Sequence, residues 1–256
     1  MRIGICGGPE VARPAIDAGF DYVELPVQLL RGTSDDFDAA PYADLNWESA
    51  NLFFPGSFRI YGPDADDWRR YARRVAERAA RLGIRVLVLG GGGIRRAPAG
   101  VEPAAAEAEF VETAATLHSI AWEFGVAVAP ESLNRTETDV GNSLPDLAAA
   151  LAAKGTPYTA DAYHVLREWD LGGRHGDPSA PEFWRSQIPH APAHCHLADR
   201  TRNLPSLDDP PILAFLRRLV ELGYDRRVSL EAPVGDTPLA DVARRMRELV
   251  AAAERD

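Results

Sequence analysis

The sequence predicts a single α/β domain, residues 1–256, folded as a (β/α)8 barrel, the TIM barrel. Short apolar runs alternate with stretches of helical spacing eight times along the chain. The length of 256 residues, of which 46% are hydrophobic, suits one barrel and is short for two large domains. No internal repeat or low-complexity segment interrupts this order.

The predicted strands are short runs rich in apolar and β-branched residues, as is typical of buried parallel strands. In chain order they are Ile3–Cys6, Tyr22–Leu25, Ala50–Phe54, Val86–Leu89, Val126–Ala129, Tyr158–Asp161, Ala193–Leu197 and Val228–Glu231. Between the strands, apolar residues recur at spacings of three and four, which indicates amphipathic helices. The clearest helical faces follow the third, seventh and eighth strands, at 68–82, 212–219 and 239–250.

Glycines and prolines mark the ends of these elements. Pro210–Pro211 suits a first helical turn. A glycine follows a helical run and precedes a strand at four places, where it can adopt the left-handed helix cap: Gly19, Gly83, Gly125 and Gly223. Eight strand–helix alternations favour a closed barrel over an open, doubly wound sheet. The five long connections (55–63, 90–104, 131–143, 162–180 and 199–209) all follow strands, so we expect them on one rim.

The composition bears on partners and on cellular setting. A formal net charge of −10 argues against a nucleic-acid partner, because phosphate backbones repel an acidic surface. No run of about 18 apolar residues is present, so we expect no membrane partner. Cys6 and Cys195 match no disulfide or metal spacing, and the first residues lack a signal peptide. We therefore expect a cytoplasmic protein.

Polar side chains close the last four predicted strands: Glu131, Asp161, His196 and Glu231. Neighbouring parallel strands would aim these side chains at one point above the barrel axis. A single strand-end carboxylate is more typical of a helix cap or salt bridge, but three carboxylates together would repel one another, and a divalent cation removes that repulsion. We therefore predict that the four residues bind one divalent metal ion. Oxygen ligands with one imidazole suit Mn²⁺, our first choice, and also Mg²⁺, Co²⁺ or Zn²⁺.

The same residues lie in motifs that resemble the xylose-isomerase-like TIM barrel superfamily, in particular its sugar isomerases and ketose 3-epimerases of the D-tagatose 3-epimerase type. The resemblance spans nearly the whole chain. Its most specific pieces are ESLNRTET at 131–138, DAYH at 161–164, HCHLADRTR at 194–202 and SLEAP at 229–233. Weaker pieces are NLFFP at 51–55 and GGGGIRRAPAG at 90–100.

The resemblance implies roles for individual residues. The four strand-end residues match the family's metal ligands, and Glu131 and Glu231 also match two catalytic carboxylates that exchange a proton with a substrate carbon from opposite faces. His164 and Arg202 match residues that bind the substrate, and Glu137 matches an acid beside that histidine and glutamate, which we group with the substrate-binding set. The implied partner is a small-molecule sugar or polyol ketone. A homo-oligomer is also expected, because relatives are often dimers or tetramers.

Two departures from the family pattern lie in the rim loops that shape the pocket. Ser132 stands where the family often has proline, and NLPS at 203–206 stands where many relatives have a Pro-Gly pair. Both leave the four predicted ligands intact, so they bear on the substrate and not on the metal.

The ligand set and the resemblance together predict a metal-dependent sugar epimerase or isomerase. The reaction would be proton transfer through a metal-bound enediolate between Glu131 and Glu231. Return of the proton to the same carbon inverts that carbon, whereas return to the neighbouring carbon interconverts aldose and ketose, so both outcomes stay open. The alternatives are a lyase or dehydratase of the inosose-dehydratase type, an apurinic endonuclease, which would need more metal ligands and a basic groove, and a non-enzymatic sugar-responsive protein.

Some polar and aromatic residues near the rim have two interpretations each. Glu24 closes the second strand and is either a substrate or rim contact or a structural salt-bridge partner. For His194, two residues before His196, a packed interior histidine that supports the ligand is favoured over a fifth ligand. The four glycines at 90–93 are interpreted as a flexible loop with an arginine, Arg95 or Arg96, at the rim, in preference to a phosphate cradle. Phe53 and its neighbours Phe54 and Phe58 are expected to be exposed, at the pocket wall or a subunit contact.

Overall fold

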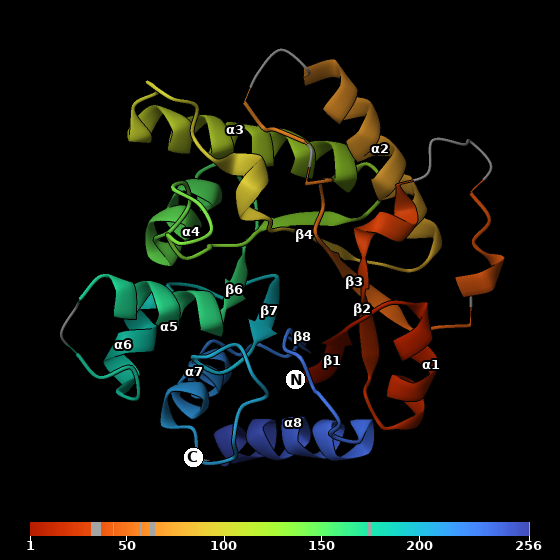
Figure 1. Ribbon diagram of the computed structural model, residues 1–256, viewed down its shortest axis with the longest axis vertical. Coiled ribbons are helices and arrows are strands. Elements are labelled where there is room, and N and C mark those ends of the chain that lie inside the picture. Colours follow the sequence, from red (N-terminus) through yellow and green to blue (C-terminus); the bar gives the residue numbers. More distant parts are fainter. Residues whose placement is uncertain (32–36, 43, 57, 62–64, 174–175, 256) are drawn as a thin grey trace.

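Eight parallel strands form a nearly closed barrel, and helices surround it (Figure 1). The structure is a computed structural model that describes residues 1–31, 37–42, 44–56, 58–61, 65–173 and 176–255. The strands are β1 (Arg2–Cys6), β2 (Tyr22–Pro26), β3 (Trp47–Asn51), β4 (Val86–Leu89), β5 (Ala127–Pro130), β6 (Thr159–Asp161), β7 (His194–Leu197) and β8 (Arg227–Leu230). The predicted (β/α)8 TIM-barrel fold is therefore confirmed.

The connections between strands are uneven. The described part of the β2–β3 connection holds the 3-10 helices η1 (Val27–Leu30) and η2 (Ala40–Tyr42), whereas the β6–β7 connection holds two α-helices, α5 (Ala162–Leu171) and α6 (Pro181–Gln187). The other helices are α1 (Pro9–Asp17), α2 (Ala65–Arg81), η3 (Gly92–Arg95), α3 (Pro103–Trp122), α4 (Leu144–Ala152), α7 (Pro210–Glu221) and α8 (Leu239–Glu254).

Helix ends agree with the sequence signals. Helix α7 begins at Pro210, and the side chain of its N-cap, Asp209, accepts a hydrogen bond from the amide of Ile212. All four glycines that were expected to cap helices have positive φ, for example 83° at Gly83 and 65° at Gly223. These residues can adopt that conformation because they lack a Cβ atom.

The hydrogen-bonded ring of strands has one seam. Strand order is β5-β4-β3-β2-β1-β8-β7-β6, so β5 and β6 are the two ends of the paired sheet. In the described part of the chain, one isolated parallel bridge, Glu131 with Thr159, joins these ends. The Thr159 hydroxyl also donates a hydrogen bond across the seam to the carbonyl oxygen of Ala129, at 3.2 Å.

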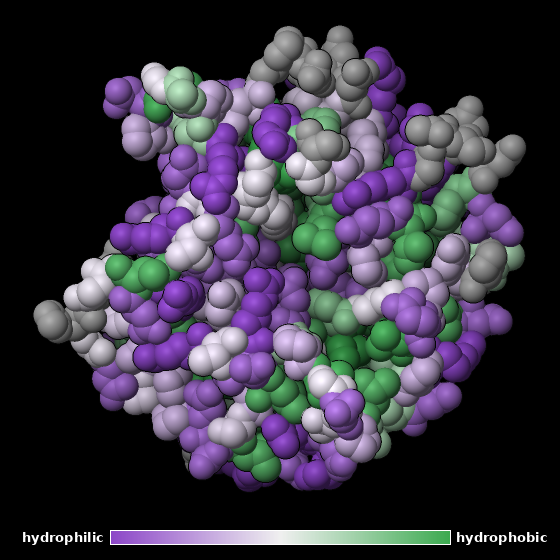
Figure 2. All heavy atoms as spheres, in the orientation of Figure 1, coloured by the Kyte–Doolittle hydropathy of each residue, from purple (hydrophilic) through white to green (hydrophobic). Residues whose placement is uncertain are grey.

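The apolar core lies mainly between the strands and the surrounding helices. On β4, Leu87 and Leu89 belong to this outer core, whereas Val86 and Val88 belong to a separate small cluster. Successive side chains of a strand point to opposite faces, so Val86 and Val88 point into the barrel. The face of the molecule seen in Figure 2 carries many hydrophilic residues, with groups of hydrophobic residues between them at its centre and below it. No helix in the described residues is long and apolar enough to cross a membrane.

The prediction for the third strand was wrong by three residues. The structure places β3 at Trp47–Asn51 instead of Ala50–Phe54. Leu52 has a φ of 55°, a left-handed conformation that ends the strand. Phe53 and Phe54 are 0% and 4% exposed, so the expectation that they are exposed was also wrong.

These aromatic rings are buried because they pack on one another. The Phe53 and Phe54 rings meet edge to face at 4.7 Å, and Phe54 stacks on Phe58 at 4.1 Å. An apolar run in the sequence predicted a strand, but the run instead forms an aromatic cluster that follows the strand.

Candidate metal centre

The four residues predicted to bind a metal come together at the C-terminal end of the barrel. Asp161 and His196 are paired across β6 and β7. Glu131 and Glu231 directly follow β5 and β8, and their backbone amides donate hydrogen bonds to Leu89 and Leu197 carbonyl oxygens on neighbouring strands. The strands themselves therefore fix where each side chain starts.

One donor atom from each of the four residues lies within 4.8 Å of the donors of the other three. The Nδ1 atom of His196 is 2.7 Å from a Glu131 oxygen, 3.7 Å from an Asp161 oxygen and 3.9 Å from a Glu231 oxygen. Two ligands bound at about 2.1 Å to one ion lie at most about 4.2 Å apart. Three carboxylates and one imidazole at these separations fit a divalent cation after small side-chain movements.

The electrostatics of the group show how crowded the carboxylates are. Burial, together with the charges of Glu131 and Glu231, raises the pKa of Asp161 well above its usual range. Burial opposes the charge on His196, but Glu24, Glu131 and Glu231 raise the pKa of the imidazole well above its usual value. Positive charge at this point is therefore favoured, and a divalent cation supplies more of it than one proton does.

His164 lies in the first turn of α5, beside the four residues. The N-cap of this helix is Asp161, whose Oδ1 accepts a hydrogen bond from the His164 amide at 3.0 Å. The Nδ1 atom of His164 accepts from the Asn134 amide nitrogen at 3.2 Å, so the ring proton sits on Nε2. Burial is the main reason that the pKa of His164 falls to about 4, which keeps this ring neutral.

Arg202 joins two of the other predicted residues. Its guanidinium donates to an oxygen of Glu231 at 3.0 Å and to an oxygen of Glu137 at 3.3 Å. It also lies over the ring of Tyr163, 5.1 Å from the centroid. Burial opposes its charge, but Glu231, Asp161 and Glu137 raise the pKa of Arg202 above its usual value. All seven predicted site residues are thus neighbours, and their roles remain predictions.

A second polar layer lies deeper in the barrel, centred on Glu24, which is 0% exposed. One oxygen of Glu24 is 2.8 Å from His196 Nε2, and the other is 2.6 Å from His194 Nε2. That second oxygen also accepts hydrogen bonds from the hydroxyls of Ser49 and Ser229 at 2.9 and 2.6 Å. Burial opposes ionisation, but His196 and His194 lower the pKa of Glu24 well below its usual range. These contacts fit the interpretation of Glu24 as a salt-bridge partner, and His194 is the interior histidine that was favoured.

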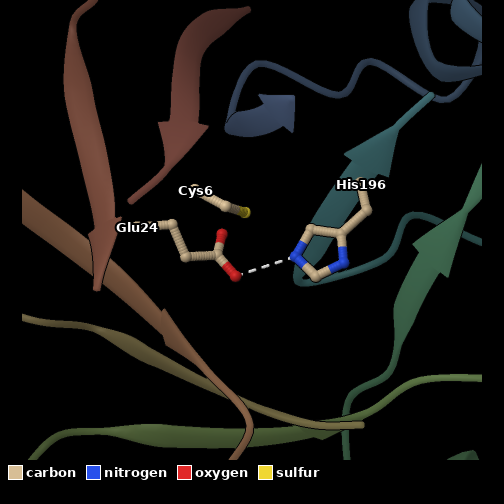
Figure 3. A group of neighbouring side chains, drawn as sticks. All are labelled: Cys6, Glu24 and His196. Atoms are coloured by element: carbon tan, nitrogen blue, oxygen red, sulfur yellow. Dashed lines mark hydrogen bonds and ion pairs between the residues drawn. The ribbon is translucent and has the colours of Figure 1, made fainter. Parts of the chain in front are cut away.

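Cys6, at the end of β1, lies beside Glu24 and His196, and Figure 3 shows its sulfur directed toward them. Burial, followed by the charges of Glu24, Glu231 and other acids, raises the pKa of the Cys6 thiol well above its usual range. The sequence prediction did not place Cys6 beside the site, because the spacing between the two cysteines carries no information about this position. Its inward position on β1, in register with Glu24, was the available signal.

The two arginines of the loop after β4 lie in different surroundings, and of the two Arg96 is exposed. Arg95 was expected at the rim as one of two candidates, but its side chain is 0% exposed and stacks on Phe110 at 4.8 Å. None of its three guanidinium nitrogens has a hydrogen-bond partner among the described residues. Burial lowers the pKa of Arg95 to about 10, although Glu131 and Glu107 oppose this. Arg96 makes a 3.5 Å contact to the Thr136 carbonyl oxygen.

Known proteins share this fold over nearly their whole length. The family model described as the xylose isomerase-like TIM barrel matches residues 12–253. The apo form of 3-keto-D-glucoside 4-epimerase from E. coli is 18% identical, with a TM-score of 0.74 over 98% of this chain and 99% of that chain. D-Psicose 3-epimerase from Clostridium cellulolyticum H10, with D-tagatose, is 15% identical, with a TM-score of 0.72 over 100% and 96%. The IOLI protein with a zinc atom is 14% identical, with a TM-score of 0.67 over 99% and 98%. No curated protein has a significantly similar sequence.

Proposed function

The chain belongs to the xylose isomerase-like TIM barrel family, and from this premise we propose that it is a sugar epimerase or isomerase that depends on one divalent cation. The observation that carries the proposal is the convergence of Glu131, Asp161, His196 and Glu231 from four consecutive strands, with donor atoms within 4.8 Å of one another. Two structures of the same fold are named as sugar epimerases, and a third holds zinc, which supports the same proposal.

The four residues would hold the cation, and Mn²⁺ is our first choice. When bound, the cation would supply positive charge that stabilises negative charge developing on substrate oxygens. The proposed substrate is a small ketose or polyol ketone. His164 and Arg202 would bind its oxygens, and Glu137, which accepts a hydrogen bond from Arg202, would hold that guanidinium in place.

Glu131 and Glu231 would move the proton. A hydrogen on the carbon beside a ketone is weakly acidic, so its removal needs a carboxylate within about 3–3.5 Å of the reacting carbon. Glu131 and Glu231 follow β5 and β8 and flank the strands of Asp161 and His196. One carboxylate would take the proton and the other would return one, which inverts the carbon when both act on the same atom.

The two glutamates have different surroundings. The Glu131 side chain is 5% exposed and touches His196, whereas the Glu231 side chain is 19% exposed and accepts a hydrogen bond from Arg202. Arg202 would thus orient the more accessible carboxylate.

The test is exchange of substrate hydrogen with solvent deuterium. The purified protein, loaded with Mn²⁺, is incubated with a panel of free ketoses in D₂O, and deuterium in the sugar is measured by NMR. We expect Glu131→Gln and Glu231→Gln each to lower epimer formation by about 10²–10⁴-fold. Glu123→Gln, which alters an exposed ion pair with Arg73, is the control and should leave the rate unchanged. Full exchange in either active-site variant would contradict the assigned roles.

The same Mn²⁺-loaded protein, assayed also with inososes and with a duplex that contains an abasic site, separates the alternatives. Conversion between 3-epimers supports an epimerase, and interconversion of aldose and ketose supports an isomerase. Loss of water from an inosose would instead support the lyase or dehydratase. Cleavage of a duplex with an abasic site would support the endonuclease and overturn the proposal.

A further inference from the structure

We propose that Glu24 is a positioning residue, which fixes the tautomer and orientation of His196 so that Nδ1 faces the cation. The inference rests on the proposed metal centre and adds a residue that the family motifs in this chain do not include. Among the described residues, the hydrogen bond that joins Glu24 to the four proposed ligands is the one to His196, so Glu24 acts on the geometry of the centre through that histidine.

The two nitrogens of His196 face different groups. Nδ1 faces the ligand set, 2.7 Å from Glu131, while Nε2 is 2.8 Å from an oxygen of Glu24. A metal ion binds the lone pair of a neutral imidazole, which then carries one proton on its other nitrogen. With the cation on the Nδ1 side, the proton must lie on Nε2, where Glu24 accepts it. Carboxylates that accept this second proton orient a histidine ligand and strengthen its bond to the metal.

Glu24 is itself held from several strands, which is what a positioning group requires. Its second oxygen accepts hydrogen bonds from His194 on β7, Ser49 on β3 and Ser229 on β8. The Ser229 hydroxyl also bonds the hydroxyl of Tyr22, two residues before Glu24 on β2, at 2.8 Å. The carboxylate cannot rotate away from His196 without breaking these contacts, because the whole side chain is buried.

Gly4 on β1 makes room for this arrangement. A Cβ atom at Gly4 would lie 2.3 Å from the ring of Tyr22, so a larger residue would push that ring out of its place. The barrel interior beside Gly4 therefore has room for the Tyr22 ring. Close packing there holds this ring, and the polar layer around Glu24, in one arrangement.

A second metal ion beside Glu24 is the competing explanation for the same residues. Donor atoms of Cys6, Glu24 and His196 also lie within 4.8 Å of one another (Figure 3). An ion there would take the Nε2 lone pair, so with Nδ1 also bound His196 would have to lose both ring protons. Glu24 would also have to give up its hydrogen bond from Nε2. The hydrogen-bonded arrangement explains the same contacts with an ordinary neutral imidazole, so it is the one we propose.

The affinity for Mn²⁺ tests the proposal without any substrate. Free Mn²⁺ is followed by electron paramagnetic resonance during titration of the purified protein. We expect Glu24→Gln, which keeps the shape of the side chain, to weaken Mn²⁺ binding by about 10–100-fold. The matched control is Glu48→Gln on β3, because Glu48 is also a partly buried, ion-paired carboxylate but its partners are Arg2 and Arg227. It should keep the wild-type affinity. Equal affinities for the wild type and Glu24→Gln would overturn the proposal.

A spectroscopic measurement tests which nitrogen of His196 faces the cation and which faces Glu24. In the Zn²⁺-loaded wild type, ¹⁵N NMR of labelled histidine should show the His196 proton on Nε2, with Nδ1 unprotonated. This measurement needs no variant, so it tests the proposed orientation of His196 even if Glu24→Gln fails to fold. A proton on Nδ1 would overturn the proposal.

The stoichiometry of Co²⁺ binding addresses the competing explanation. We expect one equivalent and no thiolate-to-cobalt absorption band. Two equivalents, with a band that disappears in Cys6→Ala, would assign a second ion to Cys6, Glu24 and His196 and overturn the proposal. If Mn²⁺ binds as expected but no sugar is turned over, the proposed function fails and the role of Glu24 stands. If the wild type binds no divalent cation, both fail.

Discussion

Gly90 lies directly against one of the proposed ligands, so its replacement tests the geometry of the metal centre without removing any ligand. A Cβ atom at Gly90 would lie 2.6 Å from the Oε2 atom of Glu131. A Cβ atom at Gly93, in the same loop, would meet no heavy atom within 4 Å among the described residues. Gly90→Ala and Gly93→Ala are therefore the same substitution in the same loop, with and without a close contact to the site.

The size of the effect follows from these distances. Ordinary contact begins at 3.4 Å, so the Glu131 oxygen must move by about 0.8 Å in Gly90→Ala. Metal–ligand distances hold within about 0.2 Å, so this displacement exceeds what the centre tolerates. We expect Mn²⁺ affinity to fall at least tenfold, which corresponds to about 1.4 kcal/mol. The contact is to the end of a flexible side chain, so the barrel itself should lose little stability.

The measurements are the Mn²⁺ dissociation constant and the melting temperature of the metal-free protein. Gly90→Ala should show weaker binding with a melting temperature close to that of the wild type, and Gly93→Ala should match the wild type in both. Wild-type affinity in Gly90→Ala would refute the assignment of Glu131 as a ligand in this geometry. A similar loss in both variants would show that the loop, and not the contact with Glu131, is responsible.

Three further predictions concern substrate, metal and pH. Arg202→Lys should raise the KM for the ketose about tenfold, because one ammonium cannot serve both Glu137 and Glu231; steady-state kinetics check this. Removal of the metal with EDTA should lower the melting temperature by roughly 5–10 °C, because a cation at 100 times its dissociation constant contributes about 2.7 kcal/mol. Burial lowers the pKa of His118, so the folded protein binds fewer protons than the unfolded chain, and this contribution to stability is lost as pH falls through 6.5 toward the folded pKa. Urea midpoints between pH 7 and pH 5 should therefore fall less steeply in His118→Gln than in the wild type.

Most of the fold was predictable because each strand is a short buried run between helices with clear ends. The third strand was not, because two signals disagreed there. The segment from Trp47 to Asn51 mixes polar and apolar residues, whereas Phe53 and Phe54, which follow it, belong to a more apolar run and therefore gave the stronger strand signal. Tertiary packing decided between them: the left-handed Leu52 ends the strand and the rings form their own cluster with Phe58.

The outer layer of the site was predictable and the inner layer was not. Glu131, Asp161, His196 and Glu231 are strand-end positions, so the barrel topology alone brings them together. Which partner Glu24 takes depends instead on the depth and stagger of four strands. Ser49 lay outside the strand predicted from the sequence, although the alternation of Ser49 and Asn51 marks an inward polar face once β3 is in place.

Burial can also reverse what a sequence pattern suggests. Arg95 follows four glycines, a pattern typical of an open loop, yet its side chain packs on Phe110. A charged residue next to glycines gives no local signal that a distant helix will cover it.

The seam between β5 and β6 has a mechanical consequence. Glu131 stands on one side of the seam and Asp161 on the other, and one backbone bridge joins the two strands in the described residues. On the proposed assignment, a cation bound by both side chains would join β5 to β6. Its removal would leave a curved sheet whose two edge strands are only weakly connected. Amide hydrogens of β5 and β6 should then exchange faster in the metal-free protein, while β1 and β2 on the far side of the ring keep their protection. The ion proposed to act on the substrate would therefore also stabilise the closed form of the barrel.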